Sequence, residues 1–574
     1  MKVFRPFLLL AVALIIIALA WLWWNSPQKV DMSGYVPADS LVYLEANSLP
    51  DIAGGIISTD AWKALAPPAG IRSDIGKVGW LSRLAAWTGI GSADAVVFSR
   101  AQIAVTVMGL DAADAGDTLR VKPRYALVVV THTSEARTRA AVEKRVGDFA
   151  RRVYGEPRVE TREVEGIRFT TWSAPGSERH IVAAVETSLA VIGNDEAAVQ
   201  ACLAVRRGER PSLSGNLQME EMRRRVDSGG ALAFGYVSPV GTARLLEVAA
   251  TAYAGQISPD PRAQSAAASM LPQMARKILG GLGWSARIAG GNVEDRYFLS
   301  LQDGVAARLN DALASPAQPT FGVSELLPGE TYSMSLYNYR DPELAWRGLN
   351  AAISSQLDVT SAFIFSRLLE ASLKPYGIEE PDRFLRSIGS EIVTARLDDT
   401  GSSTVTIVEV RDEKALREFV ARKLGPNPRT ERAGDAELLV STDEERGAAS
   451  FVAGHLLMGS QAHVRACLDA RTPGPNLASS DAFQRAVRLV SADSPASVVT
   501  YTDDSQPART FISAIIAQRG ARERPADDSN FEAALWRLRY AASETRLVEG
   551  GFEKRTRSSF GQFGTLATQF APNK

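Results

Sequence analysis

Cysteine and histidine are both scarce in this chain of 574 residues. Its two cysteines and four histidines exclude a disulfide-stapled scaffold, an iron–sulfur protein and a multi-cysteine zinc module. Charge of one sign is also lacking, because 64 Lys and Arg residues balance 65 Asp and Glu residues. Nucleic-acid binding needs a basic surface, so we expect no nucleic-acid partner. The 45% of hydrophobic residues that the chain does have is enough for a globular core.

Long hydrophobic runs are absent from the chain with one exception near its start. Residues 7–24 read FLLLAVALIIIALAWLWW and carry no charge. A helix of this length spans about 27 Å, enough for the hydrocarbon core of a bilayer. Lys2 and Arg5 precede the run, so the positive-inside rule places residues 1–6 in the cytoplasm. We therefore predict a transmembrane anchor at 7–24, a linker at 25–35 and an extracytoplasmic body.

A cleaved signal peptide is the alternative to this anchor. Ala18-Leu19-Ala20 has the small-x-small form of a cleavage site. Cleavage there would leave a new N-terminus that begins Trp-Leu-Trp-Trp, which is unfavourable for a soluble end. Both alternatives place the body of the protein outside the cytoplasm.

Two segments of the chain follow the same plan. Residues 37–46 and 328–337 each combine a proline-led turn with an apolar strand pattern. A helical pattern then begins at Asp51 in the first segment and at Asp341 in the second, and in both we expect the Asp to cap the helix. Further matches follow in the same order along the chain.

One of these matches surrounds the two cysteines. Residues 199–203 read VQACL and residues 464–468 read VRACL. Matches in one order predict a tandem duplication with copies at 36–314 and 321–574, joined by a proline-containing linker at 315–320. Consecutive strand patterns within each copy favour antiparallel pairing. The predicted fold class is therefore α+β, with two units of mostly antiparallel sheet covered by helices.

Cys202 and Cys467 occupy equivalent positions on short predicted helices with apolar neighbours. We predict two buried core thiols. A disulfide between them is an alternative, which requires Cα atoms within about 7 Å. Catalytic thiol chemistry is the second alternative.

The histidines are His132, His180, His455 and His463, and no two of them have the helical spacing of a metalloprotease motif. We expect a structural role for each. A site that brings His455 and His463 together stays open as an alternative, although their equivalents in the first copy are not histidines.

Sequence motifs with a known chemistry are missing from the chain. It has no EF-hand loop, P-loop, serine nucleophile elbow or dinucleotide-binding fingerprint. Residues 280–283 (GGLG) follow a predicted helix and are expected to form its C-terminal cap and turn. The carboxylate pairs lie in polar stretches, where solvated loops are expected: Asp503-Asp504, Glu444-Glu445 and Asp527-Asp528. We therefore assign no catalytic, cofactor-binding or metal-ligating residue and expect no cofactor.

Basic clusters occur at 223–225 and at Arg519, Arg522 and Arg524. We expect them to be solvated faces, with contact to anionic headgroups or cell-wall polymers as the alternative. Residues 263–279 are expected to form a core-facing amphipathic helix, with a membrane-surface or ligand-groove helix as the alternative.

The opening of the body, VPADSLVYLEANSLPDI at 36–52, and the AFQRA helix at 482–486 follow a single N-terminal span. In this combination the chain resembles an uncharacterised bacterial family of N-terminally anchored envelope proteins, a domain of unknown function. The resemblance covers most of the region after the anchor. It implies a bacterial, extracytoplasmic setting and brings no site residues. With the predicted anchor, we expect a single-pass protein of the bacterial inner membrane with its body in the periplasm or outside.

These observations favour a membrane-anchored, extracytoplasmic binding or scaffold protein of the cell envelope over an enzyme. Its expected partners are the membrane, through residues 7–24, and other envelope proteins. A carrier of lipid or another apolar ligand is one alternative, which requires a continuous apolar cavity. An envelope hydrolase or transferase with a site between the repeats is the other, which requires convergent, perturbed titratable groups.

Overall fold

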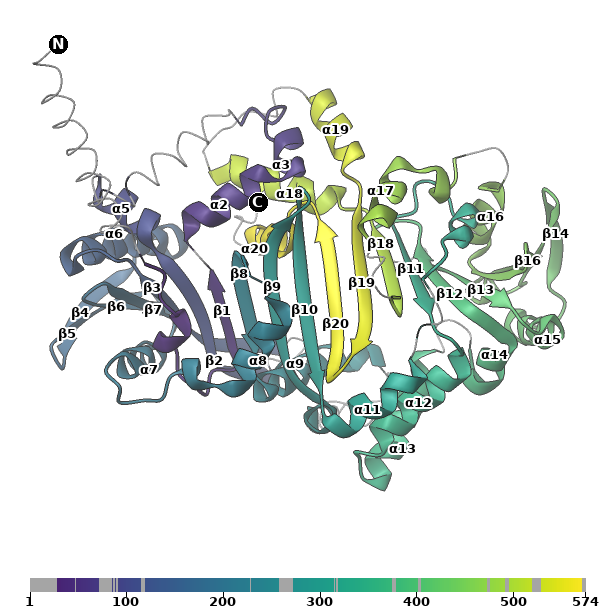
Figure 1. Ribbon diagram of the computed structural model, residues 1–574, viewed down its shortest axis with the longest axis horizontal. Helices are drawn as coiled ribbons and strands as arrows, with labels where there is room; N and C mark the ends of the chain where they lie inside the picture. Colours follow the sequence, from purple (N-terminus) through teal and green to yellow (C-terminus); the bar gives the residue numbers. More distant parts are fainter. Residues whose placement is uncertain are drawn as a thin grey trace, which may run out of the picture. The chain divides into compact units, whose positions relative to one another are not determined.

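A computed structural model describes residues 28–569 of the chain, with gaps (Figure 1). The gaps are residues 47, 72–84, 86–87, 89–90, 115–118, 228, 258–271, 314, 316–317, 374–377, 401–403, 472–474, 491–494 and 519–527. The fold is α+β, and its strands pair in antiparallel register. The predicted anchor at 7–24 lies outside the described residues, and within them we find no helix with the length and apolar character needed to cross a bilayer.

The described residues form two compact units. The first contains residues up to 58, 72–268 and 281–287, and the second contains 59–71, 269–280 and 288 onward. Residues 288–314, which the sequence analysis placed in the first repeat, therefore belong with the second unit. The reason is strand pairing, because β10 (Asn292–Leu301) forms a long antiparallel ladder with β20 (Gly551–Ser558).

The sheet of the first unit has the strand order β9–β8–β1–β2–β3–β7–β6–β5–β4. Its strands are Val42–Ala46 (β1), Gln102–Asp114 (β2), Leu119–Val130 (β3), Arg158–Val164 (β4), Ile167–Ser173 (β5), His180–Glu186 (β6), Leu189–Gly193 (β7), Ala233–Val237 (β8) and Leu279–Ala289 (β9). Strand β4 has the sequence RVETREV and is exposed along most of its length. Charged side chains on such an outer strand discourage pairing with other chains.

Helices pack against this sheet and bury its apolar side chains. They are η1 (Met32–Tyr35), α2 (Leu49–Ser58), α5 (Ala93–Arg100), α6 (Glu135–Tyr154), α7 (Glu196–Arg206), η2 (Leu213–Gly215), α8 (Leu217–Val226) and α9 (Pro239–Ile257). Val142, Val146 and Ala150 lie on one face of α6 because they are three or four residues apart. They pack with Trp172 of β5 and Ile181 of β6 in one hydrophobic cluster.

The sheet of the second unit has the strand order β10–β20–β19–β18–β11–β12–β13–β17–β16–β15–β14. The strands not yet given are Ser333–Asn338 (β11), Ile388–Arg396 (β12), Thr404–Val410 (β13), Arg429–Ala433 (β14), Ala436–Val440 (β15), Ala448–Val452 (β16), His455–Gly459 (β17), Val498–Thr502 (β18) and Ala541–Val548 (β19). Figure 1 shows β10, β20 and β19 as long neighbouring strands.

The helices of the second unit are α3 (Asp60–Leu65), α11 (Asp303–Ala312), η3 (Gly322–Leu326), α12 (Pro342–Ser354), α13 (Val359–Ser372), α14 (Pro381–Ser387), α15 (Glu413–Leu424), η5 (Glu444–Arg446), α16 (Gln461–Asp469), η6 (Leu477–Ser479), α17 (Asp481–Leu489), α18 (Ser505–Gln518), α19 (Asp528–Arg537) and α20 (Gly561–Gln569). Its main core joins strand residues such as Leu336 and Ile407 to Cys467 of α16 and Phe483 of α17. These side chains are almost wholly buried, so apolar burial is the main stabilising contribution here.

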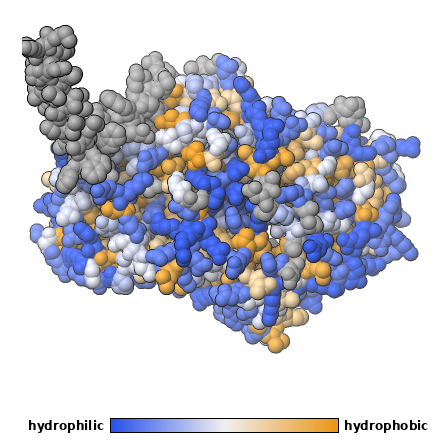
Figure 2. All heavy atoms as spheres, in the orientation of Figure 1, coloured by the Kyte–Doolittle hydropathy of each residue, from blue (hydrophilic) through white to orange (hydrophobic). Residues whose placement is uncertain are grey.

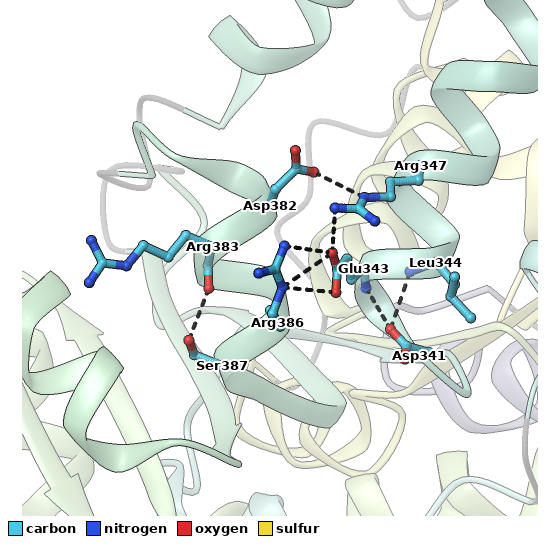
Figure 3. A network of polar contacts seen from close by, with 8 residues as sticks. All are labelled: Asp341, Glu343, Leu344, Arg347, Asp382, Arg383, Arg386 and Ser387. Atoms are coloured by element: carbon cyan, nitrogen blue, oxygen red, sulfur yellow. Dashed lines mark hydrogen bonds and ion pairs between the residues drawn. The ribbon is translucent and has the colours of Figure 1, made fainter.

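A network of ion pairs joins α12 to α14 at the surface (Figure 3). Glu343 of α12 accepts contacts from Arg347 at 2.7 Å and from Arg386 of α14 at 3.1 Å. Arg347 also lies 3.8 Å from Asp382. The arginines are half exposed or more, so the network orients the two helices and adds little to stability.

Several local predictions are confirmed. The backbone N–H of Ser40 donates to the carbonyl of Pro37, and that of Thr331 donates to the carbonyl of Pro328, so both proline-led turns form. Asp341 caps α12 through its side chain, with proline at the first helical position.

Two local predictions are wrong. Asp51 lies inside α2, and Thr59 caps the separate helix α3 instead. Residues 280–283 continue strand β9 and form no helix cap. A Cβ atom at Gly283 would lie 3.1 Å from Met222, so glycine here permits close packing of the strand on α8. Of the predicted core-facing helix at 263–279, residues 263–271 lie outside the described residues. Residues 272–278 are helical with Met274 and Ile278 buried in a core cluster, as predicted, and Leu279 begins β9.

Candidate functional site

A cavity of about 590 Å³ opens in the second unit. This volume lies within the range of small-molecule sites. Its walls come from the turn before β11, the segment from η6 into α17, strand β18 and the end of α19. The lining residues are Pro328, Gly329, Glu330, Pro475, Asn476, Ser479, Ser480, Asp481, Ala482, Arg485, Tyr501, Trp536, Arg537 and Arg539.

Trp536 is the large aromatic side chain of this cavity, and it is 60% exposed. The guanidinium of Arg539 lies 4.2 Å from the centre of its ring, a cation–π contact. Arg539 is itself held in place, because its Nε donates to Asp503 Oδ2 over 2.5 Å. Asp503 is buried and also accepts the backbone N–H of Ser505. The indole of Trp536 therefore lies beside Arg539, a cation that the buried carboxylate of Asp503 holds in position.

Arg485 projects from α17 and is half-buried in the cavity wall. Its NH1 atom donates to the backbone carbonyl of Arg537 over 3.0 Å. Its guanidinium also lowers the pKa of Tyr540, which burial raises more strongly. Within the described part of the chain, neither Arg485 nor Arg537 forms an ion pair with a carboxylate. Arg485 thus keeps uncompensated positive charge and free N–H donors.

The first turn of α17 also faces the cavity. Ser480 is the N-cap residue of this helix, but its side chain makes no capping hydrogen bond. Asp481 and Glu330 are exposed carboxylates at the cavity lining. The cavity therefore combines a half-buried arginine with carboxylates that face solvent.

A second polar group in this unit is buried. Asp504 Oδ2 accepts the backbone N–H of Ser559 over 2.7 Å, and Asp295 Oδ2 accepts that of Gln562 at the start of α20 over 3.0 Å. Burial, together with the charges of Asp503 and Asp295, raises the pKa of Asp504 to about 7 against the opposing effect of hydrogen bonds from Ser559. The expectation of a solvated loop at Asp503-Asp504 is wrong, because both carboxylates are buried. They accept hydrogen bonds from backbone N–H groups and from Arg539, donors that need partners when they are buried. Of the other pairs, Glu444-Glu445 is exposed as predicted, and Asp527 lies outside the described residues.

The first unit contains a different buried polar group. Tyr43 donates its hydroxyl proton to Glu45 Oε2 over 2.6 Å, and Arg223 pairs with Glu45 Oε1. The guanidinium of Arg223 also lies 4.4 Å from the ring centre of Phe234. Arg223 was expected on a solvated face, and this is wrong because it points inward to a carboxylate. Its neighbours Arg224 and Arg225 are exposed, as expected, whereas Arg519, Arg522 and Arg524 lie outside the described residues.

The histidines do not form a shared site. His455 Nε2 lies 3.6 Å from Glu391 Oε2, and this carboxylate raises the pKa of the imidazole. His463 Nδ1 instead contacts Ser460 Oγ at 2.7 Å at the start of α16. The other two bond to different groups, His132 to Gln102 and His180 to the carbonyl of Glu178. Each histidine thus has its own separate partner, which indicates a structural role for each.

Both cysteines are free thiols and fully buried. Cys202 lies on α7 and Cys467 on α16, and burial raises the pKa of each to about 12. A thiol with so high a pKa is not a nucleophile at neutral pH. The prediction of core thiols is confirmed, and neither alternative is found.

Metal chemistry gains no support from the structure. Across the described ranges, no three or more His, Cys, Asp or Glu side chains are grouped so that they could hold a metal ion. Comparison with protein-family models, curated proteins and solved structures found no match to this chain. The site must therefore be interpreted from its own geometry.

Sequence reasoning missed the cavity. Its lining comes from segments near residues 328, 480, 501 and 537, which no single motif joins. Trp536 itself offers no clear sequence signal, because it follows the apolar residues Ala534 and Leu535 of α19 and reads like part of their buried face.

Proposed function

We propose that this chain is a membrane-tethered, extracytoplasmic binding protein of the bacterial cell envelope, and that its second unit binds a polar ligand in the Trp536 cavity. The tether is the apolar run at 7–24 with Lys2 and Arg5 before it. The observation that carries the binding role is the cavity itself, which places an exposed indole beside half-buried arginines. Pockets of this kind, with few and well-placed polar groups, are typical of ligand sites.

We further propose that the two units descend from one duplicated unit. In the first unit β1 pairs with β2 and β8, and in the second β11 pairs with β12 and β18. The outer strands also pair in the same order in both units. The antiparallel series β3–β7–β6–β5–β4 of the first unit corresponds to β13–β17–β16–β15–β14 of the second. Isolated bridges join Pro37 to Ser212 and Pro328 to Asn476 at corresponding places.

This correspondence identifies what differs between the units. At the place in the first unit that matches the cavity, Arg210 binds both carboxylate oxygens of Asp39, at 2.9 and 2.7 Å. Asn216 caps α8 there by accepting backbone N–H groups through its side chain. In the second unit Ser480 makes no such cap and Glu330 has no arginine partner among the described residues. The turn that Arg210 and Asp39 close in the first unit therefore borders an open cavity in the second unit. This difference supports a binding role for the second unit alone.

Two other functions are less well supported. A lipid carrier requires a long apolar cavity, and among the residues that the structure describes the apolar hollow beside Phe483 and Val499 measures about 10 Å³. That is space for about one water molecule and not for an acyl chain. A hydrolase or transferase requires convergent catalytic groups, whereas His455 and His463 have separate partners.

The location can be tested with a cysteine at the cavity rim. Ser479 is exposed and both native thiols are buried, so Ser479→Cys creates one accessible thiol. We expect a membrane-impermeant maleimide to label this variant in intact spheroplasts and to leave the parent chain unlabelled. Labelling that appears only after lysis would contradict an extracytoplasmic body.

Binding can be tested by co-sedimentation of the detergent-solubilised full chain with isolated cell walls. We expect Trp536→Ala to lower the bound fraction at least fivefold. Phe363→Ala is the matched control, because Phe363 is equally exposed, at 61% against 60%, but lies on α13 outside the cavity. Equal loss with both variants would show non-specific apolar adhesion and would refute a site at Trp536.

A further inference from the structure

We infer that the ligand of this cavity is a ring-shaped molecule with a single negative charge, held with its carboxylate on Arg485 and its ring on Trp536. This inference rests on the proposed binding function and adds the chemical class of the ligand.

The charge of the ligand follows from Arg485. Its guanidinium is half-buried, and its contacts are to the carbonyl of Arg537 and to Tyr540, both uncharged groups. Partly burying a cation without a counter-ion is unfavourable, and a ligand carboxylate would supply that counter-ion. The remaining N–H groups of a guanidinium can bind both oxygens of one carboxylate. Arg485 is therefore the anion-binding residue of the cavity.

A single charge is favoured over a double one. Asp481 and Glu330 also line the cavity and are exposed. Arg539 cannot balance them fully, because its Nε is already paired with Asp503. A dianion such as inorganic phosphate would bring two negative charges toward both carboxylates, whereas a monoanion brings one and meets half of that repulsion. The rim therefore selects against multiply charged ligands.

The ring of the ligand follows from Trp536. Its exposed indole offers a flat apolar face, and such faces stack on rings. The contact with Arg539, itself fixed by Asp503, reduces the freedom of the indole before the ligand arrives. Asn476 and Ser479 add polar groups that suit hydroxyls on the ligand.

Two kinds of molecule share this chemistry, an acidic sugar and an aromatic acid. The cavity volume of about 590 Å³ accepts one or two rings of either kind. At the proposed extracytoplasmic location, polymers that contain acidic sugars are the natural ligand source. The experiment below includes one probe for the acidic sugar and one for the aromatic acid.

The test is a titration of the detergent-solubilised full chain labelled with 5-fluorotryptophan and followed by fluorine NMR. The chain has ten tryptophans, and Trp536→Phe assigns the resonance of Trp536 by its disappearance. The probes are galacturonate, benzoate, galactose and inorganic phosphate. We expect galacturonate or benzoate to shift the Trp536 resonance in a saturable way, and galactose and phosphate to bind at least tenfold more weakly.

Variants separate the parts of this inference. Arg485→Gln should weaken binding of the acidic probe at least tenfold while leaving the free Trp536 resonance in place, which shows that the site is still folded. Arg210→Gln in the first unit is the matched control and should leave binding unchanged. A saturable shift by galacturonate alone identifies the acidic sugar, and one by benzoate alone identifies the aromatic acid.

The contrary results are distinct. Binding of galactose as tight as that of galacturonate would overturn the assignment of an anionic ligand and leave the proposed binding function standing. Tighter binding of phosphate would overturn the preference for a single charge. No saturable shift with any probe, together with no loss of cell-wall binding in Trp536→Ala, would overturn both the inference and the proposed function.

Discussion

Replacing Asp504 with asparagine is expected to raise the stability of the second unit at neutral and alkaline pH. Asp504 is almost wholly buried, and its Oδ2 accepts one backbone N–H, that of Ser559. An asparagine oxygen can accept the same bond, and the amide carries no charge. The variant therefore keeps an acceptor for the backbone N–H of Ser559 and removes the cost of ionising a carboxyl group in this place.

The size of the effect follows from the raised pKa. Burial raises the pKa of Asp504 to about 7, against an ordinary value of 3.8 for an aspartate. The folded state therefore binds the proton more tightly than the unfolded state. Stability from this group is fully present below pH 3.8 and is lost as pH rises toward 7. Each pH unit costs about 1.4 kcal/mol, so the loss approaches 4 kcal/mol above pH 7.

Urea unfolding of the full chain at several pH values measures this loss. Other groups titrate equally in parent and variant, so we expect the difference between their unfolding free energies to isolate Asp504. Asp504→Asn should match the parent near pH 4 and exceed it by about 4 kcal/mol at pH 8. Asp481→Asn, at an exposed carboxylate, is the control and should show no such trend. Parallel pH curves for parent and Asp504→Asn would refute the argument.

Two further predictions concern ion pairs. Glu45→Gln leaves Arg223 half-buried without its carboxylate and should destabilise the first unit by about 2 kcal/mol in urea unfolding. Replacing Tyr43, Glu45 and Arg223 together with apolar side chains should recover most of that loss. Failure to recover it would contradict the argument. Glu391→Gln removes the carboxylate that raises the pKa of His455. The unfolding free energy of the parent should therefore exceed that of the variant by about 1 kcal/mol below pH 6.5, and this difference should disappear as the pH rises through the raised pKa. A difference that grows with pH would contradict this sign.

Local chemistry explains which parts of the fold the sequence could predict. The proline-led turns at 37–40 and 328–331 and the capping of α12 depend on residues a few positions apart, so the sequence contains their cause. The burial of Cys202 and Cys467 follows in the same way from their apolar neighbours. Features of this kind need no knowledge of the tertiary structure.

The remaining features depend on residues distant in sequence. Arg223 faces inward because Glu45 lies on the strand beneath α8, 178 positions away. Asp504 is buried because Ser559 and α20 return to it at the end of the chain. Residues 280–283 belong to strand β9, where Gly283 lies close against α8 and Gly280 lies close against Ser300 of β10. In each case the deciding partner is absent from the local sequence, so local patterns favoured the common solvated or turn alternative.

The Tyr43–Glu45–Arg223 group and the open cavity lie in different units, and under the proposed duplication we argue that this difference separates the roles of the two units. The first unit buries Tyr43, Glu45 and Arg223, where the register of the second unit places Met334 and Leu336. At these two strand positions the second unit has apolar side chains and needs no internal ion pair, while Arg485 in its cavity wall pairs with no carboxylate among the described residues. The first unit instead uses Arg210 to close the corresponding turn on Asp39. If the two units descend from one, as we propose, a closed turn in the first and an open cavity in the second are the arrangement expected of a structural module joined to a binding module.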